Sequence, residues 1–420
     1  MSYSLVATEL FFREKCQICH KSSNFVAELN DDDDMETKEY TREAAELLGR
    51  LIEIPSVSRE EKEAADLLFE QMTTWGLQPR REGNNVWAVS PDFDPKRETV
   101  LLNAHIDTVK PVATWTRDPF KATWEGDRLY GLGSNDCGGG LVSLLQTFRI
   151  LTSEGRLQTT DYRRQTVDNR LHTVDNRRQT VDNRLQTEDG GGKRNFVFLA
   201  SCEEEVSGKD GIVRALPLLP RIDVAIVGEP TGMQPATAEK GLMVIDGYAH
   251  GVSGHAAREE GVNAIYEALD DLVWLRDYRF EKVSPLLGPT KMTVTVVEAG
   301  TQHNVVPDTL HFVIDVRPNE YYDNEQLFDF LCQHMKKCEL KARSFRLHSS
   351  TIDADHPLVQ RCIGMGMKPY GSPTLSDQAL MPFVSLKLGP GQSSRSHSAD
   401  EFICLSEIED AIGKYLSLLS

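Results

Sequence analysis

Apolar residues recur at helical spacing in two stretches near the start of the chain. They are Ala45, Leu47, Leu48, Leu51 and Ile52 in residues 43–54, and Ala64, Leu67, Leu68 and Met72 in residues 60–75. Spacings of three and four residues place side chains on one face of a helix. The pattern therefore predicts two helices, each with one apolar face against a core.

Short apolar runs follow, with the length and composition of strands. They span residues 85–90, 99–103, 196–201 and 224–227. Unbroken apolar runs of this length are typical of strands that are buried on both faces. A helix expected over 137–151 lies between the second and third runs. Strands that alternate with helices predict βαβ units, so we expect an α/β fold with a mostly parallel sheet.

The pattern changes near Gly241. Residues 242–249, 291–298 and 309–317 alternate between apolar and polar types, and helical patterns cover 262–275 and 323–336. These elements predict a compact α+β unit whose sheet is open on one face. Residues 344–420 return to the first pattern and end in a helix expected over 406–419. We therefore expect an α/β domain of residues 36–240 and 344–420, with a nested domain of residues 241–343.

Residues 1–35 differ from the rest, and we expect them to be a poorly ordered extension. They contain Cys16-Gln17-Ile18-Cys19-His20, the spacing of a c-type haem attachment site, which can also bind zinc. Haem attachment of this kind requires export, and the first residues show no export signal. The acidic run of Asp31 to Asp34 follows, and Met35 is an alternative start.

Residues 158–192 consist of five units of seven residues: QTTDYRR, QTVDNRL, HTVDNRR, QTVDNRL and QTEDGGG. A heptad is also the period of a coiled coil, but Arg178 interrupts its apolar positions. The low complexity predicts a disordered loop over 157–192 that interrupts one βαβ crossover. We expect deletion of Leu157–Gly192 to leave activity largely intact, because such loops project into solvent.

Composition and charge narrow the classes of function. The 420 residues include 46 Lys and Arg against 64 Asp and Glu, a formal net charge of −18. Proteins that bind nucleic acid carry basic surfaces, so we expect no such partner. No apolar run approaches the roughly 18 residues of a membrane span, so we expect no membrane partner. Without a secretion signal, we expect a cytoplasmic protein whose eight cysteines are free thiols.

Histidines and carboxylates gather where the predicted strands end. The segments are Asn103-Ala104-His105-Ile106-Asp107, Cys202-Glu203-Glu204-Glu205, Gly228-Glu229-Pro230-Thr231, the glycine-rich stretch around Asp136, and Ser394–Glu401 with His397. The carboxyl ends of parallel strands form the ligand-binding edge of a sheet. The glycine-rich stretch matches neither common phosphate-loop spacing.

The residue types in these segments indicate a metal site. Imidazole nitrogens and carboxylate oxygens, without cysteine, suit Zn²⁺, Co²⁺ or Mn²⁺ in a catalytic centre. Adjacent carboxylates repel one another unless cations neutralise them. A carboxylate that bridges two metal ions would suit hydrolysis. Each segment alone is also compatible with a solvated loop.

The order of the motifs along the chain resembles that of the M20 metallopeptidase family. The motifs are HxD at 105–107, GxGxxDxxGG at 131–140, three acidic residues at 203–205, GEPT at 228–231, GHAA at 254–257, NVVPD at 304–308 and SHxADE at 396–401. Within the family, the chain resembles the acetylornithine deacetylase branch, near succinyl-diaminopimelate desuccinylase. The resemblance covers about residues 40–420 apart from the repeat.

The resemblance implies a role for each motif position. The metal ligands would be His105, Asp136, Glu205, Glu229 and His397, with Asp136 bridging two divalent ions, Zn²⁺ first and Co²⁺ or Mn²⁺ as alternatives. Glu204 would be the general base, and Asp107 would orient His105. The nested domain would be a lid and dimerisation domain, and through it His255 would reach a neighbouring subunit's active site.

Other positions follow the family or depart from it. Asn304 and Arg317 match positions that touch the substrate carboxylate, although Arg317 also suits a structural ion pair, and His303 and His311 are expected to be structural. A cis peptide bond is a candidate at Asp136–Cys137. Cys137-Gly138 stands where many members have Met-Lys.

The resemblance implies a metal-dependent amidohydrolase that deacylates an N-acyl amino acid. The first expectation is conversion of N-acetyl-L-ornithine to L-ornithine and acetate in arginine biosynthesis, by a homodimer. Alternatives are the same chemistry on N-acetylcitrulline, N-succinylcitrulline, succinyl-diaminopimelate or a dipeptide. A different class is a non-catalytic binding protein on a retired hydrolase fold.

Overall fold

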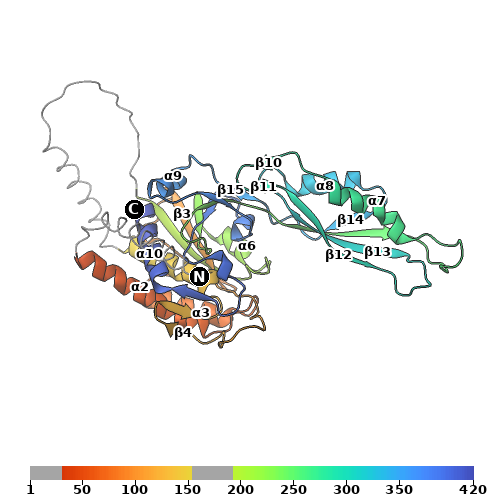
Figure 1. The fold of residues 1–420 in the computed structure, drawn as a ribbon. Coiled ribbons are helices and arrows are strands. Elements are labelled where there is room, and N and C mark those ends of the chain that lie inside the picture. The colour runs from red at the N-terminus through yellow and green to blue at the C-terminus, as the bar shows by residue number, and fades with distance from the viewer. Residues whose placement is uncertain (1–30, 154–192) are drawn as a thin grey trace, which may run out of the picture.

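A computed structural model describes residues 31–153 and 193–420, and these form two bodies joined near residue 241 (Figure 1). The larger body holds the nine-stranded sheet and most helices, and the smaller one extends from it with a four-stranded sheet and two helices. The Cys16–His20 motif and the heptad repeat lie outside the described residues. No helix within 31–153 and 193–420 has the length and apolar character that crossing a bilayer requires.

The larger body is built on a nine-stranded sheet in the order β1-β2-β6-β3-β7-β17-β8-β15, with β16 beside β8. Its strands are β1 (Arg80–Glu82), β2 (Asn85–Val89), β3 (Thr99–His105), β6 (Asn195–Ser201), β7 (Val224–Val227), β8 (Ala236–Glu239), β15 (Ser350–Thr351), β16 (Tyr370–Ser372) and β17 (Ser385–Lys387). The central strands β6, β3, β7 and β17 run parallel, while β1, β2 and β15 pair antiparallel. The predicted α/β class is confirmed, and the sheet is mixed, with parallel strands at its centre and antiparallel pairings on both sides of them.

Helices cover both faces of this sheet. They are α2 (Asp31–Ile52), α3 (Lys62–Thr74), α4 (Gly139–Thr152), α6 (Ile212–Ala215), α9 (Pro357–Gly364) and α10 (Leu405–Leu419). Short helical turns are η1 (Ser134–Gly138), η2 (Leu216–Leu218), η3 (Asp377–Leu380) and η4 (Ser393–Arg395). A three-stranded sheet of β4 (Thr123–Glu125), β5 (Arg128–Tyr130) and β18 (Phe402–Cys404) lies beside them.

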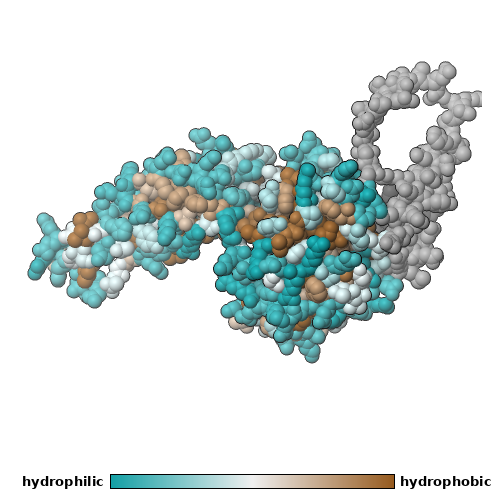
Figure 2. All heavy atoms as spheres, turned by 180° about the vertical axis from the view of Figure 1, so that it is seen from behind, coloured by the Kyte–Doolittle hydropathy of each residue, from teal (hydrophilic) through white to brown (hydrophobic). Residues whose placement is uncertain are grey.

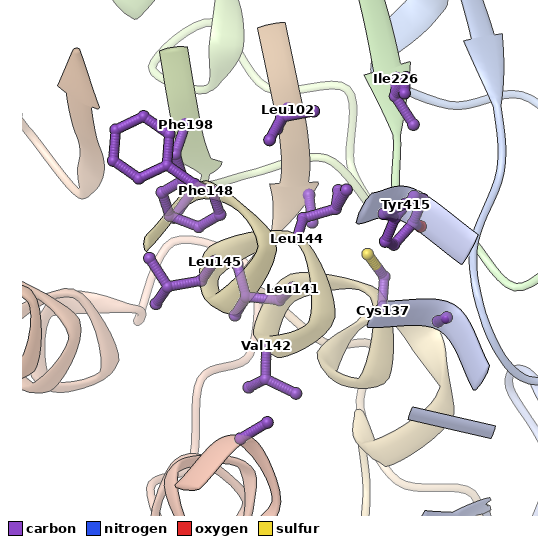
Figure 3. Packing of buried hydrophobic residues seen from close by; sticks show 14 of the residues in the cluster. Leu102, Cys137, Leu141, Val142, Leu144, Leu145, Phe148, Phe198, Ile226 and Tyr415 are labelled. Atoms are coloured by element: carbon purple, nitrogen blue, oxygen red, sulfur yellow. The ribbon is translucent and has the colours of Figure 1, made fainter. Parts of the chain in front are cut away.

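The main core lies between the sheet and α4, α2 and α10. Figure 3 shows α4 side chains such as Leu144 and Phe148 close to Leu102 and Phe198 of the strands, with Tyr415 of α10 at the other end. Leu101, next to Leu102, belongs to a second cluster on the opposite face of the sheet. Because both faces are covered, the sequence of β3 is apolar at consecutive positions.

The smaller body is a four-stranded antiparallel sheet in the order β12-β13-β9-β14. Its elements are β9 (Met243–His250), α7 (Ala264–Asp277), β12 (Lys291–Ala299), β13 (Thr309–Arg317), α8 (Asn324–His334) and β14 (Glu339–Ala342), and a hairpin of β10 (Val283–Ser284) and β11 (Gly288–Pro289) lies between α7 and β12. A separate core of residues including Phe312 and Leu331 packs between the sheet and its helices. All these elements fall within residues 241–343, the range expected for the nested unit.

Two expected boundaries need correction. Helix α2 begins at Asp31, five residues before the expected start of the α/β domain at residue 36. Helix α4 begins at Gly139, two residues after the start expected at Cys137, because η1 precedes it with non-helical backbone at Asp136 and Cys137.

Candidate metal centre and active site

Three neighbouring parallel strands bring the candidate ligands to one edge of the sheet. His105 is the last residue of β3, Glu203 to Glu205 follow β6, and Glu229 lies two residues beyond β7. β3 pairs with both β6 and β7, so these ends are adjacent. The parallel topology thus collects residues that are more than 100 positions apart in the sequence.

His105 points its Nε2 at two carboxylates. Nε2 lies 3.3 Å from Oδ1 of Asp136 and 3.6 Å from Oε1 of Glu229. Its Nδ1 is 2.8 Å from the backbone carbonyl oxygen of Asp107. A hydrogen bond from Nδ1–H to that carbonyl leaves the Nε2 lone pair free, which is the tautomer that a metal ligand needs.

Asp107 has a different task from the expected one. Its Oδ1 is 3.7 Å from Nδ1 of His105, too far for a hydrogen bond, so the backbone carbonyl and not the carboxylate orients the imidazole. The buried carboxylate instead accepts hydrogen bonds from the amides of Glu204 and Glu205, at 3.0 and 3.1 Å. It also accepts one from Oγ of Ser58 at 2.7 Å. Asp107 therefore fixes the backbone of the expected base and of one expected ligand.

Asp136 lies between the two histidines. Its Oδ1 faces Nε2 of His105, and its Oδ2 is 3.5 Å from Nε2 of His397. His397 is also 3.0 Å from Oε2 of Glu205. The Asp136–Cys137 peptide bond is cis, as expected. One carboxylate with a histidine on each side is the arrangement that a bridging ligand requires.

Glu401 is a site residue that the sequence analysis did not assign. Its carboxylate accepts hydrogen bonds from the backbone amides of Gly133, Asn135 and Asp136, at 3.2, 2.8 and 2.9 Å. It is buried and connects the segment after His397 to the loop that carries Asp136. The sequence did contain a signal for a role of Glu401, because Glu401 is the last residue of the SHxADE motif.

Two more residues that sequence reasoning missed support the loop after β6. The fully buried Glu61 accepts hydrogen bonds from the Glu203 amide at 3.3 Å and from the Asn84 side chain at 3.0 Å. Asp377 accepts a hydrogen bond from Oγ of Ser201, at the end of β6, at 2.5 Å. Neither residue stands in a motif whose spacing reveals its contact.

The electrostatics of the cluster fit a site for cations. Burial and the neighbouring Glu229 carboxylate raise the pKa of Glu204 well above its usual range. Burial and the Asp136 carboxylate raise the pKa of Glu229 to about 8. These shifts express the cost of gathering carboxylates in one buried place, a cost that divalent ions offset. The donor set of imidazole nitrogens and carboxylate oxygens fits such ions.

The ligand atoms form two overlapping groups. The first group consists of His105, Asp136 and Glu205. The second consists of His105, Cys137 and Glu229. Within each group, the ligand atoms lie within 4.8 Å of one another. The sequence analysis expected a ligand set without cysteine, and in the structure the Cys137 thiol lies beside these atoms. The cysteine was passed over because it stands in a segment chosen for Asp136.

The residues expected to act through the lid lie away from this cluster. His255 and Asn304 are neighbours: His255 and Val305 form an isolated β-bridge, and the amide of Ala256 donates to the carbonyl of Asn304 at 3.0 Å. The loops that carry them, between β9 and α7 and between β12 and β13, lie at the far end of the smaller body (Figure 1). His255 is exposed. In one subunit, the structure does not bring them to the metal cluster.

Arg317 lies at the opposite end of β13 from the loop of Asn304. Eight residue steps along the strand separate Thr309 from Arg317, which corresponds to about 26 Å. Arg317 makes two hydrogen bonds to the carboxylate of Asp315, at 2.8 and 3.0 Å, so the ion pair considered from the sequence is present. Asn304 and Arg317 of one subunit therefore cannot hold the same carboxylate.

Comparisons with known proteins agree with this description. Residues 101–161 match a family model described as peptidase family M20/M25/M40, and residues 237–341 match a peptidase dimerisation domain. An acetylornithine deacetylase of Proteus mirabilis is 26% identical over 396 residues, covering 87% of this chain and 92% of that protein. A Schizosaccharomyces pombe protein described as peptidase M20 domain-containing is 25% identical over 382 residues, covering 87% of this chain and 81% of that protein.

Solved structures share the fold. The aminopeptidase PepT of Bacillus cereus superposes with a TM-score of 0.64 at 15% identity, covering 90% of this chain and 98% of that one. The YXEP protein of Bacillus subtilis is described as a dinuclear metal-binding peptidase from the M20 family. It superposes with a TM-score of 0.61 at 14% identity, covering 91% of this chain and 98% of that one. In sequence over most of its length and in fold, this chain resembles the M20 peptidase family, with acetylornithine deacetylases among its relatives.

Proposed function

We propose that this protein is a dinuclear metal-dependent amidohydrolase that removes the acyl group from an N-acyl amino acid. The observation that carries the proposal is the placement of the Asp136 carboxylate between His105 and His397. His105 and Glu229 would hold one ion, and Glu205 and His397 the other, with Asp136 shared. Two divalent ions here would make a water between them acidic and polarise a carbonyl oxygen. Zinc is the proposed metal, with cobalt or manganese as alternatives.

Glu204 supplies the proton transfers in this proposal. Its backbone is fixed through its amide by Asp107, and its side chain is next to Glu229. The carboxylate takes a proton from the attacking water and gives it to the amine that leaves when the amide C–N bond breaks. Asp136, Glu205 and Glu229 are assigned to the metal ions in this proposal, and Glu204, which is not, is the proposed carrier of the proton.

We propose that the active protein is a homodimer, joined through the nested lid domain of residues 241–343. Three apolar residues of α7, spaced by three and four positions, are exposed: Tyr266 (71%), Leu269 (47%) and Val273 (45%). Val296 and Val297 of β12 are exposed as well. On the face shown in Figure 2, apolar side chains gather on this extended part of the molecule. An unpartnered apolar stripe beside an edge strand suits a second copy of the chain.

A dimer also gives His255 a role. The loop between β9 and α7, which carries His255, lies at the far end of the lid, away from the larger body of its own chain. In the proposed dimer, His255 of the partner subunit reaches this cluster and stabilises the oxyanion that forms on the attacked carbonyl. Asn304 of the partner subunit and Arg317 of the same chain are the proposed contacts of the substrate carboxylate.

N-acetyl-L-ornithine is the proposed substrate, which would place the reaction in arginine biosynthesis. The proposal is supported by the acetylornithine deacetylase of Proteus mirabilis, which aligns with 87% of this chain. N-acetylcitrulline, N-succinylcitrulline, succinyl-diaminopimelate and dipeptides are alternatives for the same chemistry.

A substrate panel tests both parts of the proposal. Zinc-loaded protein is given each of these compounds, and release of the free amine is measured. We expect turnover of N-acetyl-L-ornithine and a fall in kcat of at least about 10³-fold in Glu204→Gln with the metal content retained. Preference for another compound would change the substrate and leave the chemistry standing. No turnover of any compound by metal-loaded protein would favour a binding protein and overturn the proposed function.

A further inference from the structure

One polar side chain at the metal centre has no part in the reaction proposed above: the thiol of Cys137. Cys137 directly follows Asp136, and it is 2% exposed. Its sulfur, a ring nitrogen of His105 and a carboxylate oxygen of Glu229 lie within 4.8 Å of one another. The thiol therefore belongs to the same cluster of donor atoms as two of the proposed ligands.

The spacing of these atoms suits a single metal ion. Donor atoms that bind one zinc ion at tetrahedral angles lie about 3.5 Å apart, given bonds of about 2.0–2.3 Å. Nε2 of His105 and Oε1 of Glu229 are already 3.6 Å apart. The sulfur lies within 4.8 Å of both ligand atoms, so its approach to the spacing of about 3.5 Å shortens each distance by at most about 1.3 Å.

The surroundings of the sulfur are only partly apolar. Cys137 packs in the main core, and Figure 3 shows its sulfur near Tyr415. A free cysteine in such a place is often a small apolar residue. Here, however, Sγ faces the carbonyl oxygen of Gly228 at 3.6 Å, and Gly228 directly precedes Glu229. The thiol thus lies where the core ends and the ligand atoms begin.

We propose that Cys137 is a thiolate ligand of the metal ion that His105 and Glu229 hold. This inference rests on the metal centre of the proposed function. On binding, the S–H bond breaks, a sulfur–metal bond forms, and the proton is released to solvent. The two ions then differ, because one has a soft sulfur ligand, which favours zinc, and the other has only nitrogen and oxygen ligands.

Cobalt is the probe that tests this proposal. Metal-free protein is titrated with Co²⁺ alone, and the absorption spectrum is recorded. Cys16 and Cys19 are further thiols that can bind cobalt, so both are replaced by Ser in every protein compared. We expect a near-ultraviolet sulfur-to-cobalt charge-transfer band together with visible bands of bound cobalt. Cys137→Ser and Cys137→Ala should lose the near-ultraviolet band and keep the visible bands.

Cys362→Ser is the matched control, because Cys362 is also fully buried but lies in α9 and in neither group of ligand atoms. It should keep both sets of bands. Should the Cys137 variants fail to fold, X-ray absorption of the zinc-loaded protein gives the answer: a sulfur neighbour of zinc at about 2.3 Å supports the proposal. A zinc shell of nitrogen and oxygen alone overturns it.

The outcomes separate this proposal from the proposed function. Bound cobalt without the near-ultraviolet band, or a band that persists in Cys137→Ala, overturns the thiolate ligand and leaves the two-metal hydrolase standing. A protein that binds no cobalt overturns both.

Discussion

Removing the metal ions should reverse the way in which the stability of this protein depends on pH. In the ligand-free protein, burial and the Asp136 carboxylate raise the pKa of Glu229 from 4.5 to about 8. Between these values the folded state keeps a proton that the unfolded state has lost. The unfolded state then binds fewer protons, so the free energy of unfolding falls as pH rises through this window.

The structure sets the size of this effect. The side chain of Glu229 is only 12% exposed, and the difference between its two pKa values corresponds to about 5 kcal/mol. His397 acts in the same direction: its hydrogen bond with Glu205 raises its pKa from 6.5 to about 9, so its contribution is also lost as pH rises. In the metal-loaded protein both side chains are ligands, protons compete with the metal, and stability should instead rise from acid to neutral pH.

Urea unfolding followed by tryptophan fluorescence, from about pH 5 to pH 9, measures both curves. The difference between the loaded and the chelated protein removes the contribution of every group that titrates equally in both. Glu229→Gln should flatten the curve of the chelated protein, whereas Glu298→Gln, at a mostly exposed carboxylate in the smaller body, should not. Parallel curves for the loaded and chelated protein would refute the reasoning.

Three further predictions concern the positioning role of Asp107, the buried ion pair of Lys387 and Glu239, and the subunit that supplies His255. Asp107→Ala leaves the amides of Glu204 and Glu205 without their acceptor. We expect kcat to fall about 10²–10³-fold, which corresponds to a loss of about 3–4 kcal/mol in transition-state stabilisation. Unchanged kcat with normal metal content would contradict the positioning role. Lys387→Met removes the ammonium group that lies 3.1 Å from the carboxylate of the fully buried Glu239. The free energy of unfolding, measured in urea, should fall by about 3–5 kcal/mol. Adding Glu239→Gln should restore much of that loss, and a double variant as unstable as the single one would speak against the pair. His255→Ala and Glu204→Gln should each be inactive alone but recover activity when mixed and allowed to exchange subunits; an inactive mixture would place His255 in its own subunit's site or in none.

The sequence predicted the large sheet well because its central strands are covered on both faces. Val100-Leu101-Leu102 is unbroken and apolar, and the structure buries these residues in clusters on opposite sides. Short strands such as β15 and β16 carry no such signal, because their two or three residues are too few for a pattern. The start of α2 was missed because an acidic run was interpreted as a solvated segment.

Three of the candidate ligands, His105, Glu205 and Glu229, were predictable because they end or follow strands β3, β6 and β7, where the parallel topology collects them. The residues that hold them in place were less visible. Ser58, Glu61 and Glu401 act through hydrogen bonds to loop backbones or to neighbouring side chains, and those contacts depend on loop conformations that no spacing rule describes. Asp107 shows the same limit, because its position was predicted and its partner was not: its carboxylate binds amides of the next loop instead of the imidazole.

The proposed function depends most on Asp136, which would be the shared ligand of two divalent ions. Native mass spectrometry of the zinc-loaded chain, beside Asp136→Ala and with Cys16 and Cys19 replaced by Ser in both proteins, tests this most directly. We expect two zinc ions per chain in the protein with Asp136 and at most one in the Asp136→Ala variant, whose fold should be intact as judged by circular dichroism. Two ions in the variant, or none in the protein with Asp136, would contradict this assignment.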